Sequence, residues 1–309
     1  MKYLYLMLLT GCATADLDAG ADLEEPEAIA TDSCLTWCQE TSPTTVRLHG
    51  VWAASASDVF AVGDGGTILR RVSGTWTRMT SPTTNNLRGV WGLSSSNVWA
   101  CGVAAGGVGT VVHFDGTSWS SVSGTTTDCE SVWAASSTDV WFTGSTSVLR
   151  WNGSTFSTAA TFSGPLLSIS GTGSSDVWVT GESTNVHHWN GSTWTTLTPG
   201  GRTTSFLSVL AVAANDDWVS DFNPGKETAH WNGSKWTVVA ASTGGWNGMS
   251  ALSSTDIWGT GGAHVGHWNG TAWSSETPPG TNPVLWSVTT RPGNAWIVGN
   301  GGLIGHRTF

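Results

Sequence analysis

The chain has 309 residues, of which only 11% are charged, and a formal net charge of −10. This balance argues against a nucleic-acid-binding protein, because no positive field is available to release counterions from phosphates. Disorder throughout is also disfavoured, since 39% hydrophobic residues, with 21 Trp among the aromatics, supply ample material for a core. No run of 18 apolar residues is present, so no membrane-spanning helix is predicted.

The N-terminus carries a short apolar run, residues 3–9, that follows Lys2 and leads into Leu9-Thr10-Gly11-Cys12. This pattern resembles a bacterial lipoprotein signal, in which the cysteine becomes the first mature residue and is acylated. The resemblance implies a signal peptide over residues 1–11, a lipid on Cys12 and attachment to a membrane. Ala13 in place of Asp resembles a signal for the outer membrane or cell surface. The alternative is an ordinary secretory signal or a wrongly assigned start.

Residues 12–32 are predicted to form an acidic tether. They contain seven acidic residues and no Lys or Arg, so the segment repels itself and cannot bury a core. Residues 33–309 then hold 15 acidic and 11 basic residues, a charge of −4, which indicates no strongly charged partner. An acidic interaction tail is the alternative to a plain spacer.

An internal repeat of about 40 residues runs through residues 33–309. Successive apolar anchors are 39, 42, 37, 40, 40 and 39 residues apart. An Asp or Asn follows six or seven residues after each anchor, and an aromatic residue follows two positions later. Most copies then reach a Trp-Asn-Gly or Phe-Asp-Gly phrase. The anchors are Val51, Val90, Val132, Ile169, Val209, Met249 and Val288.

Each repeat is predicted to contain four short strands, named a to d in chain order. Asn-Gly and Asp-Gly supply two φ > 0 residues, which favours a two-residue type I′ turn between strands c and d. Units of about 40 residues with four strands are typical of propeller blades. The sequence therefore predicts an all-β fold, a seven-bladed β-propeller of four-stranded blades over residues 33–309.

The last repeat leaves room for only three strands before the chain ends, so its fourth strand is sought at the other end of the propeller. Trp37 precedes Gly50 by 13 residues. The same distance separates Trp76 from Gly89. Residues 35–39 are therefore predicted to form the outer strand of the last blade, which closes the ring and removes an open edge.

These repeats resemble those of bacterial secreted β-propellers of the BNR or Asp-box type, with some likeness to tectonin repeats. The resemblance covers nearly all of residues 33–309 and concerns the fold more than any activity. The Asp-box motif places Ser-x-Asp-x-Gly-x-x-Trp in the hairpin, and the leading Ser is missing here. No Trp-Asp dipeptide ends the third strand, which distinguishes the chain from a WD40 propeller.

Recurrent tryptophans and basic residues are most simply explained by packing between blades. Of the 21 Trp, 19 fall at strand positions that recur from blade to blade. Trp246 and Trp286 fall outside them and are predicted to be partly exposed. Every strand c carries a His or Arg near its end, and the turn Asp or Asn is the predicted hydrogen-bond partner. These residues are Arg71, His113, Arg150, His188, His230, His267 and His306. These basic residues stand in seven different blades, so no metal site is predicted.

The predicted binding face is the one formed by the b–c and d–a loops, which share a side of the disc because strand direction alternates. Asymmetry in a near-symmetric ring is concentrated there, above all in the segment Asp221–Glu227 of blade five. An aromatic residue beside polar groups suits stacking on a sugar ring. The candidate binding residues are Trp246, Trp286, Asp221, Asn223, Lys226, Asp64 and Glu182.

Four cysteines follow Cys12, and export permits disulfides. Cys101 and Cys129 replace apolar residues in adjacent blades and are predicted to pair. Cys34 and Cys38 remain, but an i,i+4 pair in a regular strand lies about 13 Å apart, too far for a disulfide. Their pairing needs a turn or bulge and stays open.

The function predicted from these features is that of a lipid-anchored binding or scaffold module for a glycan or an envelope protein. The alternatives are a glycan-active enzyme and an assembly factor for another envelope protein. A sialidase uses a Tyr nucleophile, and both tyrosines, Tyr3 and Tyr5, lie in the signal. No catalytic residue, cofactor or nucleic-acid partner is predicted.

Overall fold

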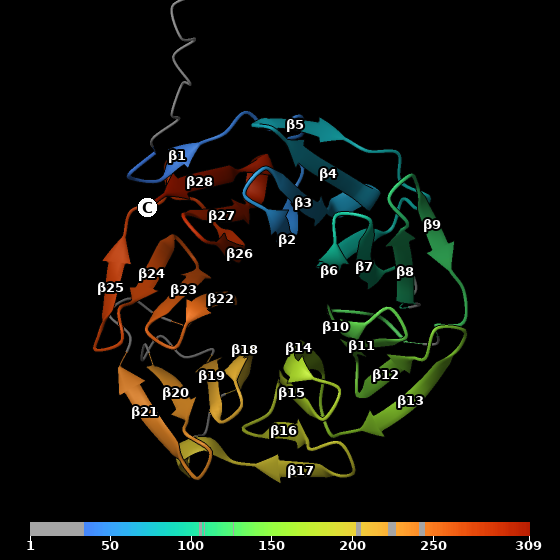
Figure 1. Ribbon diagram of the computed structural model, residues 1–309, viewed down its shortest axis with the longest axis vertical. Coiled ribbons are helices and arrows are strands. Elements are labelled where there is room, and N and C mark those ends of the chain that lie inside the picture. Colours follow the sequence, from blue (N-terminus) through green and yellow to red (C-terminus); the bar gives the residue numbers. More distant parts are fainter. Residues whose placement is uncertain are drawn as a thin grey trace, which may run out of the picture. The chain divides into compact units, whose positions relative to one another are not determined.

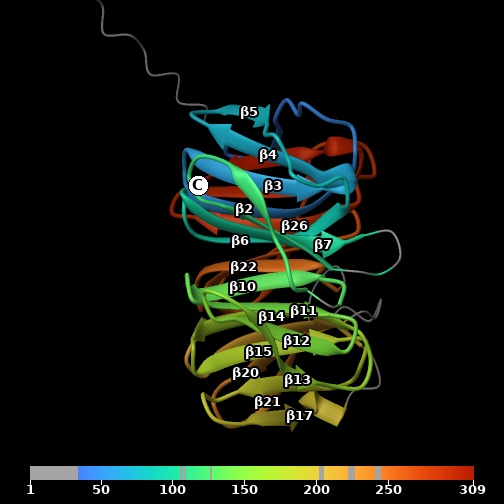
Figure 2. The ribbon, with the colours of Figure 1, turned by 90° about the vertical axis from the view of Figure 1, so that its right-hand side faces the viewer.

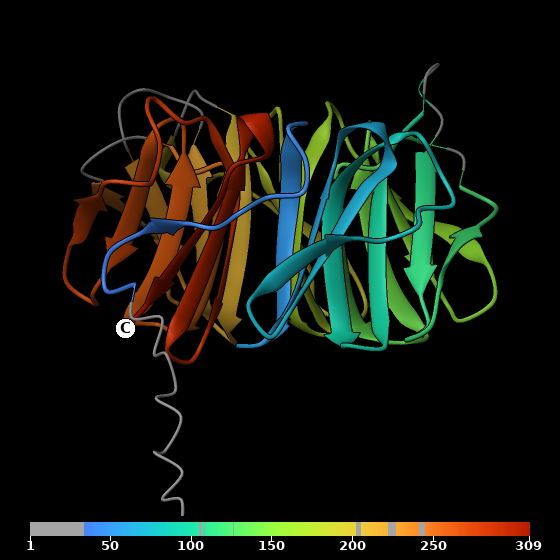
Figure 3. The same ribbon diagram turned by 90° about the horizontal axis from the view of Figure 1, so that it is seen from above.

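Seven antiparallel sheets of four strands each arrange the unit Ser33–Phe309 as a ring around a central axis (Figure 1). This computed structural model describes residues 34–309 except 105–106, 108, 126, 202–204, 222–226 and 241–244. The predicted signal peptide, Cys12 and the acidic tether lie outside the described residues. Figures 2 and 3 show the ring edge-on, with the strands crossing its thickness.

Each blade follows the predicted a-to-d order from the axis outward, so the predicted seven-bladed propeller is confirmed. In this part of the chain, no helix has the length and hydropathy needed to span a membrane. The strands are β2 (Leu48–Ser55), β3 (Asp58–Gly63), β4 (Thr67–Val72) and β5 (Thr75–Arg78) in blade 1; β6 (Asn86–Ser94), β7 (Asn97–Val103), β8 (Gly109–Phe114) and β9 (Trp119–Val122) in blade 2; β10 (Ser131–Ser136), β11 (Asp139–Gly144), β12 (Ser147–Trp151) and β13 (Phe156–Thr161) in blade 3; β14 (Leu166–Gly173), β15 (Asp176–Gly181), β16 (Val186–Trp189) and β17 (Trp194–Leu197) in blade 4; β18 (Phe206–Ala213), β19 (Asp216–Asp221), β20 (Glu227–Trp231) and β21 (Trp236–Ala240) in blade 5; β22 (Gly248–Ser253), β23 (Asp256–Gly261), β24 (His264–Trp268) and β25 (Trp273–Glu276) in blade 6; and β26 (Leu285–Arg291), β27 (Asn294–Gly299), β28 (Ile304–Thr308) and β1 (Cys38–Gln39) in blade 7.

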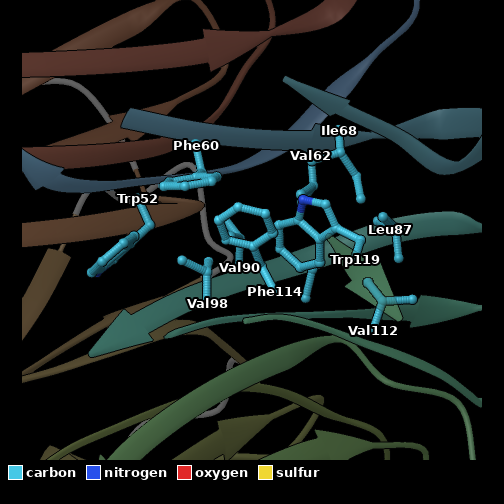
Figure 4. Packing of buried hydrophobic residues seen from close by; sticks show 11 residues of the cluster. Trp52, Phe60, Val62, Ile68, Leu87, Val90, Val98, Val112, Phe114 and Trp119 are labelled. Atoms are coloured by element: carbon cyan, nitrogen blue, oxygen red, sulfur yellow. The ribbon is translucent and has the colours of Figure 1, made fainter. Parts of the chain in front are cut away.

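The hydrophobic core lies between blades, because each sheet buries both faces against its neighbours. Between blades 1 and 2, the rings of Phe60 and Phe114 lie 5.8 Å apart, and Trp119 lies 5.4 Å from Phe114 (Figure 4). Trp52 and Ile68 join the same cluster from blade 1. The recurrent aromatic residues are therefore structural, as predicted.

A polar network repeats beside these aromatic rings. In blade 4, the Oδ1 atom of Asp176 accepts hydrogen bonds from Trp178 Nε1 at 2.9 Å and from His188 Nε2 at 2.8 Å. The two rings stack with centroids 3.9 Å apart. The predicted pairing of the strand-c basic residue with the turn Asp or Asn is thus confirmed in blades 2 to 7. It is wrong in blade 1, where the predicted Arg71 bonds to Glu40 and the preceding Arg70 bonds to Asp58. Equivalent His contacts are His113–Asn97, His230–Asp216, His267–Asp256 and His306–Asn294.

The predicted two-residue c–d turn is wrong for the Asn-Gly blades. Trp189 pairs with Trp194, so four residues form the loop. Asn190 does not adopt a positive φ; its side chain instead accepts hydrogen bonds from the backbone N–H groups of Ser192 and Thr193, at 3.0 and 2.9 Å. Only Gly191 takes the left-handed conformation, with φ 94°.

The ring closes through β1, which pairs with β28 in the register Cys38–His306 and Gln39–Gly305. Just after this strand, the carboxylate of Glu40 lies 2.7 Å from Arg71 Nη2 of blade 1 and accepts a hydrogen bond from Trp76 Nε1. The N-terminal segment therefore joins blade 7 to blade 1, and the predicted closure is confirmed.

Two disulfides are present. Cys101 of β7 bonds to Cys129 in the segment that leads into β10, as predicted. Cys34 and Cys38 also bond, with Cα atoms 5.7 Å apart, because a bend at residues 35–36 shortens the distance that a regular strand would give. This second disulfide lies at the closure joint.

Candidate functional site

Trp246, predicted to be partly exposed, is fully buried at 0%. Its ring lies 5.3 Å from Trp273 and it belongs to the core cluster of blades 5 and 6. Two glycines make the space: a Cβ on Gly259 would stand 2.6 Å from the Trp246 ring, and one on Gly266 would stand 2.3 Å from it. The prediction of an exposed Trp246 was wrong, because strand residues that are larger in most blades are glycines in blade 6.

Of the other predicted site residues in the described part of the chain, only Asp64 and Trp286 are brought together, because both contact His49, whose ring lies 5.9 Å from that of Trp286. Asp64 accepts a hydrogen bond from His49 at 2.8 Å, whereas Glu182 is exposed in a different blade. Asp221 is buried at the end of β19 and so does not present its carboxylate to a ligand on the surface. Asn223 and Lys226 lie outside the described residues.

A cavity of about 750 Å³ follows the axis of the ring and is lined by the innermost strand of every blade. The residue two positions before each anchor forms a circle on the d–a face, which we call the mouth ring. Its seven members belong to six residue types: His49, Arg88, Glu130, Leu167, Leu207, Asn247 and Trp286.

The mouth ring is polar or aromatic on blades 6, 7, 1, 2 and 3 and apolar on blades 4 and 5. Arg88 and Glu130 form an ion pair across blades 2 and 3. Burial lowers the pKa of His49, and the nearby guanidinium groups of Arg47 and Arg88 add to this, against the raising effect of Asp64. Trp286 donates to Asn300 Oδ1 at 2.8 Å. The mouth thus presents fixed charges, an aromatic ring and an apolar arc to whatever enters.

Below the mouth, a second circle of residues lines the cavity, which we call the waist ring. These are the seven anchor residues of the repeat, six of them β-branched and the seventh Met249. Their uniformity contrasts with the diversity of the mouth ring. The diverse position is visible in the sequence, where it stands two residues before each anchor. Of its seven residues, only Trp286 was predicted to be a binding residue.

A second cavity, of about 420 Å³, lies between blades 2 and 3. It is lined by two tryptophans, Trp99 and Trp151, together with His113 and several Ser side chains. Phe156 occupies the register position that holds Trp194 in blade 4, opposite the last residue of strand c. The ring at this position is therefore smaller in blade 3 than in blade 4.

Blade 5 buries an acid where most blades have Val or Ile. Asp217 in β19 is 0% exposed, and neither of its carboxylate oxygens has a hydrogen-bond partner. Burial, with added repulsion from Asp176 and Asp216, raises its pKa to about 8. The folded protein therefore holds this proton at pH 7, whereas the unfolded chain releases it.

Asp217→Asn is expected to flatten the dependence of stability on pH between about 6.5 and 8. The native pKa lies above the unfolded value, so wild-type stability falls as pH rises towards 8, by about 2 kcal/mol between roughly pH 6.5 and 8. Below about pH 6.5, His187 acts in the opposite sense, since burial lowers its pKa to about 4. Urea unfolding at several pH values measures this, with exposed Glu182→Gln as the control. An unchanged slope in Asp217→Asn would show that another group is responsible.

No group of three or more His, Cys, Asp or Glu residues is arranged to hold a metal ion in the described part of the chain.

Comparisons with known proteins support the fold and do not identify a family. No family model and no curated protein matches the sequence. Among solved structures, "YCF48 bound to D1 peptide" has a TM-score of 0.71 and 15% identity, covering 88% of this chain and 97% of its own. The WD40 β-propeller domain of Doa1 has a TM-score of 0.73 at 11% identity, covering 89% and 96%. Virginiamycin B lyase from Staphylococcus aureus has a TM-score of 0.76 at 12% identity, covering 89% and 99%. The chain is similar to all three as a β-propeller.

Proposed function

We propose that this chain is a protein-binding scaffold that holds a segment of its partner at the mouth ring. The observation that carries the proposal is the contrast between the two rings of the central cavity. Positions that serve the fold are nearly the same in all blades, whereas the mouth ring holds six residue types in seven positions. The mouth-ring residues line the cavity, so the packing between blades does not require their diversity. Binding energy in interfaces is concentrated in aromatic and Arg side chains.

The structural neighbours support a protein partner. One of them is YCF48 bound to a D1 peptide, which shares the propeller fold with this chain at 15% identity. A glycan partner is a second proposal, which the aromatic and Ser-lined cavity between blades 2 and 3 favours. Glycan binding that is lost in Trp151→Ala and kept in Trp286→Ala would support this second proposal.

Photo-crosslinking from two positions of blade 5, one in the mouth ring and one on the outer strand, tests where the partner binds. We expect p-benzoylphenylalanine at Leu207, in the mouth ring, to form a discrete protein adduct in the producing cells. The same probe at Val238, which is 44% exposed on the outer strand β21, serves as the matched control and is expected to form none. Adducts at Val238 with none at Leu207 would place the binding surface on the outside of the ring.

We further propose that the propeller works in the cell envelope, at the outer membrane or cell surface, held by lipid on Cys12. The support is the Leu9-Thr10-Gly11-Cys12 sequence and the acidic tether that follows it. Acyl chains anchor strongly because each buried CH₂ contributes about 0.8 kcal/mol.

Cys12→Ser is expected to move the protein from the membrane fraction to the soluble fraction and to abolish the acyl mass on the N-terminal peptide. Fractionation and mass spectrometry measure both. A variant with Thr14→Ser, which leaves Cys12 in place, controls for a substitution in the same segment. Wild-type fractionation of Cys12→Ser would refute the anchor.

A further inference from the structure

The wall of the central cavity between blades 1 and 7 carries two Arg–Trp pairs. The guanidinium of Arg47, just before β2, lies 5.4 Å from the ring of Trp286 in β26. The guanidinium of Arg291, at the end of β26, lies 5.7 Å from the ring of Trp52 in β2. All four residues line the cavity.

The two pairs lie at opposite ends of this wall. Val51 N donates to Ser287 Oγ and Ala53 N donates to Thr289 Oγ1, both at 3.3 Å, so β2 and β26 run side by side in the same direction. Arg47 and Trp286 lie at the starts of the two strands, whereas Trp52 and Arg291 lie towards their ends. At about 3.3 Å per residue, the five residues from position 47 to position 52 separate the pairs by about 17 Å.

Both arginines lack an acidic partner. Within the described part of the chain, no carboxylate lies within ion-pair distance of Arg47 or Arg291, whereas Arg88 is neutralised by Glu130. Arg291 donates to the Thr290 carbonyl, at 3.1 Å, and burial lowers its pKa. A guanidinium on an aromatic face keeps N–H donors along its edge for a carboxylate.

The opposite wall of the cavity carries apolar side chains. Blades 4 and 5 line it with Leu167 and Leu207 at the mouth and with Ile169, Val209 and Val212 further in. Ser168, Ser170 and Asp216 also line this wall, but the two serine hydroxyls accept hydrogen bonds from Val209 N and Ala211 N, and Asp216 is bonded to His230. The cavity therefore has a cationic and aromatic side that faces a side whose unengaged groups are apolar. An extended polypeptide has the same division, since successive side chains point to opposite faces.

We infer that the cavity takes an extended segment of the partner protein with acidic residues on one face and apolar residues on the other. This inference rests on the proposed function and adds the chemistry of the partner. Residues on one face of an extended segment are an even number apart, so acids at i and i+4 or i+6 span the 17 Å between Arg47 and Arg291 to within about a residue. A fatty acid, with one carboxylate, matches only one of the two arginines.

The test uses a fluorescein-labelled, capped nine-residue peptide in which Val alternates with polar residues, with Glu at positions two and six and Thr at four and eight. Anisotropy titration of the full chain is expected to show binding, at least tenfold weaker with Lys in place of Glu. Arg47→Ala/Arg291→Ala is expected to lose at least tenfold in affinity for the Glu peptide. Arg78→Ala, which removes an exposed cation from the outer strand β5, is expected to bind as wild type.

Equal binding of the Glu and Lys peptides, or wild-type affinity in the double variant, would overturn the inference. So would binding of oleate with none of the Glu peptide. A partner adduct from the Leu207 probe that persists in these cases would leave the proposed function standing. Loss of that adduct as well would overturn both.

Discussion

Deletion of residues 33–40 is expected to abolish folding of the propeller, whereas deletion of residues 13–30 is expected to leave its melting temperature unchanged. The first deletion removes β1, exposes the edge of β28 and takes away the Cys34–Cys38 disulfide. It also removes Trp37, whose Nε1 donates to Glu276 of blade 6 at 2.8 Å, and Glu40, which holds blade 1. Circular dichroism and thermal melting of both variants measure the difference.

A milder pair of variants keeps this prediction testable if the deletion yields only insoluble protein. Glu40→Gln leaves a buried Arg71 without its charge partner, and we expect it to cost about 3 kcal/mol. Glu182→Gln, an exposed acid in blade 4, is expected to change stability by less than about 0.5 kcal/mol. Equal unfolding curves for the two variants would contradict the closure by residues 33–40.

Trp246→Ala is expected to lower the free energy of unfolding by about 3–5 kcal/mol, because it empties a fully buried indole site. Gly259 and Gly266 leave the space that the indole fills, so the effect of a larger residue at either position depends on whether Trp246 is present. Gly266→Ala is expected to destabilise the wild type, where its Cβ would overlap the indole, and to be tolerated in Trp246→Leu.

Chemical denaturation of the four proteins in this cycle measures the coupling between Trp246 and Gly266. Additive effects would mean that the two positions do not share one space. A loss below about 1 kcal/mol in Trp246→Ala would show that the indole is exposed in solution, as the sequence pattern alone had suggested.

The architecture was predictable because the repeats can be aligned with one another within this single sequence. Seven anchors fix the number of blades, the displaced Trp37 fixes the closing strand, and Cys101 and Cys129 appear as departures in adjacent blades. Turn geometry was less accessible. Asn-Gly is compatible with a two-residue turn, and only the structure shows that the Asn190 side chain bonds to the backbone beyond it.

The candidate site was harder to predict because departures from a repeat have two causes. Trp246 departs from the repeat for packing, and its partners Gly259 and Gly266 are separated from it by 13 and 20 residues. Trp286 departs at a position that faces the cavity. Whether such a tryptophan faces the core or the cavity depends on the register of the innermost strand. The sequence does not give this register, because a bulge shifts it, as between Leu48 and Gly50 in blade 1.

The affinity of a mouth variant for the partner captured from Leu207 tests the central claim most directly. The variant replaces His49, Arg88, Glu130 and Trp286 by Ser and removes the Arg88–Glu130 pair as a whole, so no charge of that pair is left alone. We expect a melting temperature within about 5 °C of wild type and the loss of binding. Binding at wild-type affinity by this folded variant would contradict the assignment of function to the mouth ring.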